Sequence, residues 1–209
     1  KKALTQINSP LLSLQKDQKE ISLAILNGVI GDYLLESKNP LAIPMQLRYK
    51  GLPLSLNKKS LQETYPTANG KILLVAHGLC MTDTQWNFKG HNHAANLVDE
   101  FGFTAVYLNY NGGLHISDNG KQLNALLEEL TQNWPVPISE IVILTHSMGG
   151  LVSRSAIHYA EQTKNNWPSK VTKLFFLGTP HLGAPLERIG NYIDRFLGAI
   201  PYLKPFARI

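Results

Sequence analysis

The order of apolar and polar residues predicts a sheet of buried strands that alternate with helices. Four short apolar runs occur at residues 72–76, 104–108, 141–144 and 174–177. A strand covered on both faces needs such a continuous run, whereas a half-exposed strand alternates with polar residues. The runs therefore predict an α/β fold with a mostly parallel sheet and helices on both of its faces.

Apolar residues at helical spacing lie between these runs, at residues 94–101, 123–130 and 151–160. Gly102 follows the first set and is its expected C-terminal cap. Ser117 or Asp118 precedes the second set and is its expected N-cap.

The pattern of apolar and polar residues before residue 66 differs from that of the later chain. The apolar residues from Ile21 to Ile30 predict a helix, which the pair Asn39-Pro40 is expected to end. Alternation at Met45, Leu47 and Tyr49, with a second short run at residues 54–56, predicts a hairpin that leads into the sheet. Turn residues around 65–70 mark a boundary. We expect three parts: residues 1–66, a core at 67–185, and an amphipathic segment at 186–209.

Candidate chemistry lies where the third run ends, in the stretch Ile141-Val-Ile-Leu-Thr-His-Ser147-Met-Gly149-Gly150. It predicts a strand, a sharp turn and a helix, which is the setting of a nucleophilic serine. Gly149 and Gly150 would let the strand and the helix approach closely. Thr145 stands where the G-x-S-x-G pattern has its first glycine. The alternative is that Ser147 merely caps the helix.

A second motif, His77-Gly78-Leu79, closes the first run and opens a loop. Acyl transfer at Ser147 needs two backbone N–H donors for the oxyanion, and we expect them from Leu79 and Met148. We expect His77 to hold the loop by hydrogen bonds rather than to take part in catalysis.

A third motif, Gly178-Thr-Pro-His181-Leu-Gly183, follows the last run. In this order, the three motifs resemble those of bacterial triacylglycerol lipases and of inositol-deacylase-like (GPI deacylase-like) serine esterases, over about residues 71–185. The resemblance implies an α/β-hydrolase fold, hydrolysis of carboxylic esters through an acyl-enzyme on Ser147, and no metal or organic cofactor. It gives supporting places to five residues: His77, Gly78, His146, Gly149 and His181.

The same chemistry needs a histidine base and an acid, which in this fold follow the serine in the order acid, then histidine. No further strand is visible after residue 177, so we expect a fold that is incomplete at its C-terminus, with both groups beyond Ile209. The chain alone could then be inactive. His181 is kept as an alternative base, His158 is expected at the surface, and Glu187 and Asp194 are expected to be solvated helix charges.

An amphipathic stretch from Leu186 to Phe206 is either a core-facing helix or a lid over an acyl pocket, as the lipase resemblance suggests. Cys80 is expected to be a small loop residue rather than a nucleophile. The spacing of His91 and His93 does not indicate a metal site.

Net charge and its distribution indicate which classes of binding partner to expect. The net charge is +5, and nine Lys or Arg residues against four Asp or Glu lie within residues 1–60, but they are scattered. We therefore expect an ester or lipid substrate, no nucleic acid, and at most a transient contact with a membrane or lipid surface. No signal peptide or transmembrane segment is visible, so a soluble and rather cytoplasmic protein is expected. An acyltransferase with the same site, or a non-catalytic binding module with this fold, are the alternatives.

Overall fold

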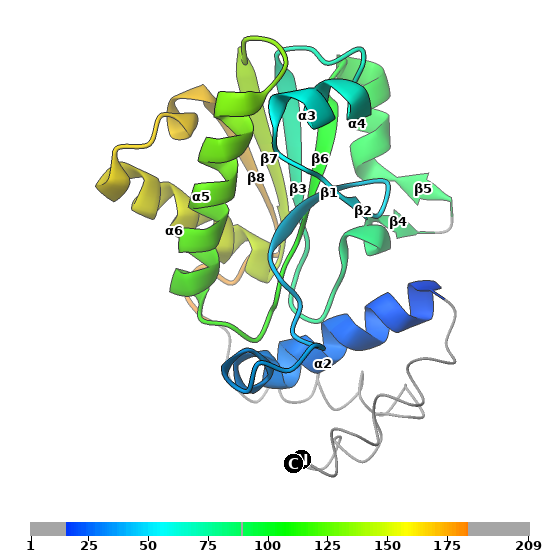
Figure 1. The fold of residues 1–209 in the computed structure, drawn as a ribbon, viewed down its shortest axis with the longest axis vertical. Helices are drawn as coiled ribbons and strands as arrows, with labels where there is room; N and C mark the ends of the chain where they lie inside the picture. The colour runs from blue at the N-terminus through cyan, green and yellow to red at the C-terminus, as the bar shows by residue number, and fades with distance from the viewer. Residues whose placement is uncertain (1–15, 89, 184–209) are drawn as a thin grey trace.

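The computed structural model describes residues 16–88 and 90–183. Its centre is a six-stranded sheet, and Figure 1 shows how the helices lie around it. The strands are β1 (Gln46–Tyr49), β2 (Leu52–Pro53), β3 (Lys71–Ala76), β6 (Thr104–Asn109), β7 (Glu140–His146) and β8 (Val171–Leu177). Their order in the sheet is β2-β1-β6-β3-β7-β8. All neighbours from β6 to β8 pair in parallel, whereas β1 pairs antiparallel with both β2 and β6. The expected mostly parallel sheet is confirmed.

Helices cover both faces of this sheet. Helices α5 (Ile116–Asn133) and α6 (Met148–Thr163), with α3 (Lys58–Thr64) and the 3-10 turn η2 (Trp167–Lys170), lie on one face. The 3-10 turn η1 (Asp83–Trp86) and α4 (His93–Phe101) lie on the other, and β4 (Asn87–Phe88) and β5 (His91–Asn92) form a separate hairpin. The α/β fold class is thus confirmed.

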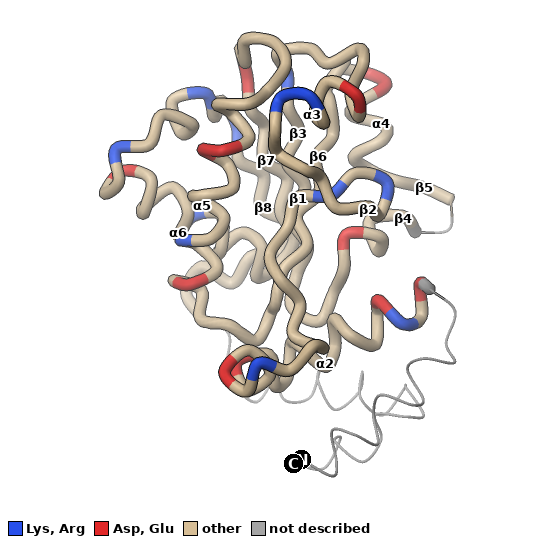
Figure 2. The backbone as a smooth tube through the Cα atoms, viewed as in Figure 1, with Lys and Arg blue, Asp and Glu red and all other residues tan. Residues whose placement is uncertain are grey.

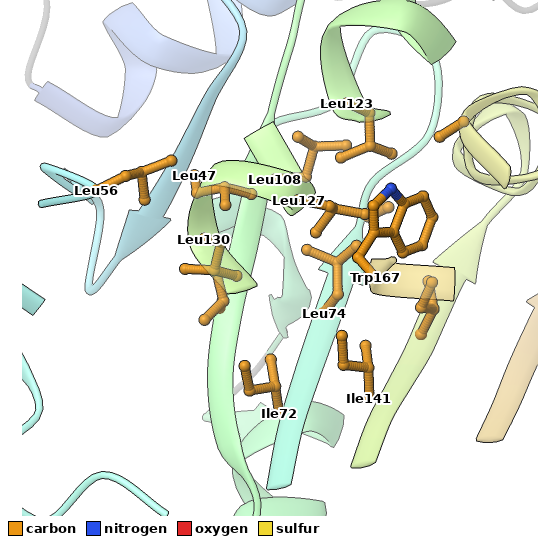
Figure 3. Close-up of a cluster of buried hydrophobic side chains, with 14 of the residues drawn as sticks. Leu47, Leu56, Ile72, Leu74, Leu108, Leu123, Leu127, Leu130, Ile141 and Trp167 are labelled. Carbon is orange, nitrogen blue, oxygen red and sulfur yellow. The ribbon is translucent and has the colours of Figure 1, made fainter. Parts of the chain in front are cut away.

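The two faces of β3 show why its apolar run is continuous. Ile72 and Leu74 point into the larger core, where leucines of α5 and Trp167 meet them (Figure 3). Leu73 and Val75 point to the opposite face, towards Trp86 and Ala94. Each of these four side chains is at most 1% exposed, so each of these positions needs an apolar residue.

The first described element is α2 (Lys16–Glu36), which confirms the expected helix and has non-helical dihedral angles at Ile30. It lies across the end of the sheet at which the parallel strands finish (Figure 1). The hairpin of β1 and β2 joins the same sheet as the later strands.

Two local expectations are wrong. Helix α5 begins with His115 at the N-cap position, so Ser117 and Asp118 lie inside its first turn. The Asn119 amide donates to the Asn111 carbonyl at 2.9 Å, and this tertiary contact ties the first turn to the preceding loop. The second strand of the hairpin is Leu52–Pro53 rather than residues 54–56. Lys50 and Gly51 both have positive φ and form a two-residue turn, so pairing resumes at once.

No helix among the described residues is long and apolar enough to cross a membrane. Basic and acidic residues are interspersed along the described chain in Figure 2. Glu187, Asp194 and the amphipathic stretch after residue 186 lie outside the described residues.

Candidate active site

Ser147 occupies the turn between β7 and α6, with φ of 49° and ψ of −120°. A positive φ is costly for a residue with a side chain, so the surrounding contacts must hold this conformation. The Ser147 N–H donates to the Leu177 carbonyl at 2.8 Å, and its carbonyl accepts from Thr179 Oγ1 at 3.0 Å. Ser147 is at the N-cap position, but its side chain makes no capping hydrogen bond. The capping alternative therefore does not explain this serine.

The two glycines after the serine are required by close packing. A Cβ on Gly149 would lie 2.5 Å from the His77 carbonyl oxygen, and one on Gly150 would overlap the Thr179 side chain. Real Cβ atoms do not approach so closely. These positions seat the start of α6 directly on the end of β3 and on the loop after β8.

Thr145, at the first position of the incomplete pattern, is fully buried. Its Oγ1 donates to the Phe175 carbonyl oxygen at 2.8 Å. This side chain thus links β7 to β8 just before the turn, which is a task that a glycine could not perform.

Residues 77–82 form a loop that meets the Ser147 turn, and we call it the Gly78 loop. A Cβ on Gly78 would lie 2.9 Å from His146 Nδ1 and 3.1 Å from Ser147 Cβ. The structure therefore brings together two motifs that are far apart in the sequence. Within the described residues, neither the Leu79 N–H nor the Met148 N–H donates to a protein acceptor. Met148 is the first residue of α6, where backbone N–H groups have no partner within the helix.

His77 is the first residue of this loop and is 1% exposed. Its Nδ1 is 2.8 Å from the Gly78 carbonyl oxygen, and because a carbonyl only accepts, Nδ1 carries the proton. Its ring stacks on Tyr110, whose hydroxyl donates to the His77 carbonyl at 2.9 Å. Burial lowers the pKa of His77 to about 4, so the ring is neutral at pH 7.

The other histidines near the turn have different surroundings. His146 Nδ1 is buried with no partner among the described residues, and burial lowers the pKa of this histidine. His181 is exposed, accepts from Arg154 Nη1 at Nδ1 over 2.9 Å, and meets the Phe176 ring edge to face. His158 is exposed beside Gln162, as expected. No described histidine hydrogen-bonds to the Ser147 hydroxyl.

The other residues considered from the sequence are Cys80 and the pair His91 and His93. Cys80 is 7% exposed, and burial raises the pKa of its thiol to about 11, so it is not a thiolate at pH 7. His91 and His93 contact each other, and the described residues hold no cluster of three or more residues able to bind a metal.

A groove of about 520 Å³ near Tyr49 and Tyr107 includes neither Ser147 nor Leu79.

The sequence reasoning missed the proximity of α2 to this site. A Cβ on Gly28 would overlap the Cys80 side chain, and one on Gly31 would overlap Asn111. The glycines at positions 28 and 31, on one helix face, were the only local signal that this face packs against backbone.

Three comparisons bear on this chain. The model of the family described as "Domain of unknown function (DUF7379)" matches residues 17–204. A protein of Yarrowia lipolytica (strain CLIB 122 / E 150) named "Putative GPI inositol-deacylase C" is 33% identical over 110 residues, which are 50% of this chain and 11% of that protein. The chain thus spans about a tenth of this relative, and the resemblance predicted from the motifs is confirmed.

Crystal structures of the Bacillus licheniformis lipase BlEst2 were also found. The mature form has a TM-score of 0.48 and 24% identity, covering 71% of this chain and 53% of that one. The propeptide form has a TM-score of 0.47 and 26% identity, covering 63% and 28%.

Proposed function

The chain belongs to the family described as a domain of unknown function (DUF7379), and we propose that it carries the nucleophile and the oxyanion donors of a serine carboxylic-ester hydrolase. One observation carries the proposal. Ser147 is held at positive φ where β7 meets α6, its side chain caps nothing, and the Gly78 loop packs against it. This is the arrangement of a nucleophile elbow beside an oxyanion hole.

In the proposed reaction, Ser147 Oγ forms a bond to the ester carbonyl carbon and gives up its proton to a base. The C–O bond to the alcohol then breaks, and the alcohol leaves with that proton, which produces the acyl-enzyme. Water attacks the acyl-enzyme in the same way, so that the carboxylic acid is released and Ser147 regains its proton. The base and its orienting acid are not assigned to any described residue.

The N–H groups of Leu79 and Met148 would bind the oxyanion of each tetrahedral intermediate. Each donor of this kind contributes on the order of 3 kcal/mol to lowering the barrier. Met148 also begins α6, whose N-terminal end favours negative charge. Both N–H groups lack acceptors within the described residues, which leaves them available to a substrate oxygen.

His77 has a positioning role in this proposal. The Gly78 carbonyl and the Leu79 N–H belong to one planar peptide group, so fixing one orients the other. The 2.8 Å hydrogen bond from His77 to the Gly78 carbonyl thus sets the direction of the Leu79 N–H. Gly78, His146 and Gly149 support the turn by packing, and His181 belongs to the loop after β8.

The name of the Yarrowia relative supports an ester of a lipid as the substrate class. An acyltransferase would use the same residues, with an alcohol in place of water as the acceptor. A non-catalytic binding module would keep the fold without a base.

The experiment is active-site labelling of the full-length protein with a fluorophosphonate probe, together with hydrolysis of p-nitrophenyl esters. We expect Ser147→Ala to abolish both, whereas Ser169→Ala, at an exposed serine, should retain both. Labelling that persists in Ser147→Ala would refute the assignment. Absence of labelling and turnover in the wild-type protein would favour the binding module, and ester formation with added glycerol would favour the acyltransferase.

A further inference from the structure

Helix α2 contacts the Gly78 loop through a glycine. A Cβ on Gly28 would overlap Cys80 Sγ and would lie 3.2 Å from the Cys80 nitrogen and 3.3 Å from its Cα. Cys80 Sγ is also 4.0 Å from the Ile25 carbonyl oxygen. The helix therefore touches the backbone of the loop at the residue that follows Leu79.

A second glycine of α2 fixes the neighbouring loop in the same way. The Asn111 side chain donates to the Gly31 carbonyl at 2.9 Å and occupies the place that a Cβ on Gly31 would take. The next residue in that loop, Gly112, lies beside Leu79, because a Cβ on it would be 3.1 Å from Leu79 Cδ1. Leu79 thus lies between Cys80 and Gly112, and the segments that contain these two residues both contact α2.

An ion-pair cluster attaches α2 to the other end of the Gly78 loop. Arg48 of β1 binds Glu20 of α2 at 3.0 Å and Asp83 of η1 at 2.7 Å. The side chains of Arg48 and Asp83 are 8% and 3% exposed. Burial raises the pKa of Asp83, and the Arg48 guanidinium opposes this effect. The loop between His77 and Asp83 is therefore linked to α2 at Cys80 and, through Arg48, at Asp83.

We propose that α2 is a positioning element of the candidate site, which holds the Leu79 N–H at the distance from Ser147 that the oxyanion requires. The inference rests on the proposed ester hydrolysis. An oxyanion donor acts only within about 2.7–3.1 Å of the oxygen, so a small shift of the loop lowers turnover. Gly28 and Glu20 are the residues of α2 that set this position, although neither touches the substrate.

The test is Gly28→Ala in the full-length protein. Alanine favours a helix over glycine by about 1 kcal/mol, so the helix itself is not weakened and any loss comes from the new contact with Cys80. We expect kcat to fall at least about tenfold while KM stays within about twofold, because the donor acts mainly in the transition state. Asp32→Ala, at an exposed position of the same helix, is the matched control and should leave both constants unchanged.

A second substitution at Cys80 distinguishes a displaced loop from a general loss of folding. Cys80 has φ of 58°, a conformation that glycine adopts without strain, and its Sγ is the atom that the new methyl group meets first. The double variant Gly28→Ala/Cys80→Gly should therefore regain activity. Its log kcat should lie above that of Gly28→Ala by at least a third of the difference between Gly28→Ala and the wild type. If Gly28→Ala does not fold, Glu20→Gln serves instead, with an expected fall in kcat of about threefold at constant KM.

The second readout does not depend on ester cleavage. Iodoacetamide alkylation of Cys80, followed by mass spectrometry of its peptide, should be slow in the wild type and at least about fivefold faster in Gly28→Ala, because the buried thiol becomes exposed. Unchanged kcat with a protected Cys80 would overturn the inference. A wild type that cleaves no ester, with a Cys80 that becomes reactive in Gly28→Ala, would refute the proposed function and leave the contact between α2 and the loop standing.

Discussion

The two sides of the Ser147 turn differ in how completely they are enclosed. On the side of the Gly78 loop, Cys80, Thr82 and Asp83 are all at most 7% exposed, and α2 packs against Cys80. On the side of β8, Phe175 is 47% exposed and Leu177 is 43% exposed. Strand β3 lies between two neighbours, whereas β8 pairs only with β7 among the described residues.

This difference indicates which part of the proposed active site lies among the described residues: the oxyanion donors rather than the base and its acid. The described residues include the two proposed N–H donors, Leu79 and Met148, and Cys80 next to Leu79 is buried against α2. They bring no base to the Ser147 hydroxyl, and the only histidine in the loop after β8 is exposed and paired with Arg154. We therefore expect changes on the loop side to be costly and changes on the β8 side to be mild.

The largest effect is expected from Arg48→Met. Removing the guanidinium leaves the buried Asp83 carboxylate without its partner, and breaking a buried pair in this way costs about 3–5 kcal/mol. Lys173→Met is the matched change on β8, where the exposed Lys173 ammonium lies 3.8 Å from the partly exposed Glu140 carboxylate, and it should cost less than about 1 kcal/mol. Urea unfolding of the two variants measures both values, and similar losses would contradict the contrast between the two sides.

An effect of intermediate size is expected from pH. Because the pKa of His77 is about 4 in the folded chain and 6.5 ordinarily, the unfolded chain binds more protons between these values. The contribution of His77 is complete above pH 6.5 and is lost as the pH falls towards 4, by about 3 kcal/mol in total.

Free energies of unfolding measured between pH 7.5 and 4.5 test this expectation. The decline should be shallower in His77→Gln, because this variant lacks the buried ring whose protonation differs between the folded and unfolded chains. His181→Gln, at the exposed histidine on the β8 side, should keep the wild-type slope. Equal slopes in all three proteins would show that His77 is not a buried neutral histidine.

The smallest effect is expected from Phe175→Ser on β8. This side chain is already half exposed, so the free energy of unfolding should fall by less than about 1 kcal/mol. Leu74→Ala in β3, where the side chain is 0% exposed, should cost about 2–5 kcal/mol. A loss above about 2 kcal/mol for Phe175→Ser in the full-length protein would indicate that another segment covers β8 there.

Much of the fold could be predicted because the central strands β3 and β7 are buried on both faces. Each strand then reads as an apolar run, and the interruption of the runs by helical spacing indicates parallel order. The start of α5 could not be predicted in this way. Ser117 and Asp118 are good capping residues, but the contact of Asn119 with Asn111 outweighs that local preference. Short elements such as α3 and β2 likewise depend on packing and on the turn at Lys50 more than on periodicity.

The sequence by itself determined the place of Ser147 between a strand and a helix, and the pairing of that motif with His77-Gly78-Leu79. Thr145 leaves the local pattern incomplete, so this prediction depended on all three motifs and on their order along the chain. Only the tertiary structure decided that α2 packs against the Gly78 loop and that the Gly78 carbonyl is the acceptor of the His77 hydrogen bond. The packing of α2 depends on contacts between residues far apart in the chain, as between Gly28 and Cys80, and a helical pattern indicates which face is apolar without indicating which backbone it will meet.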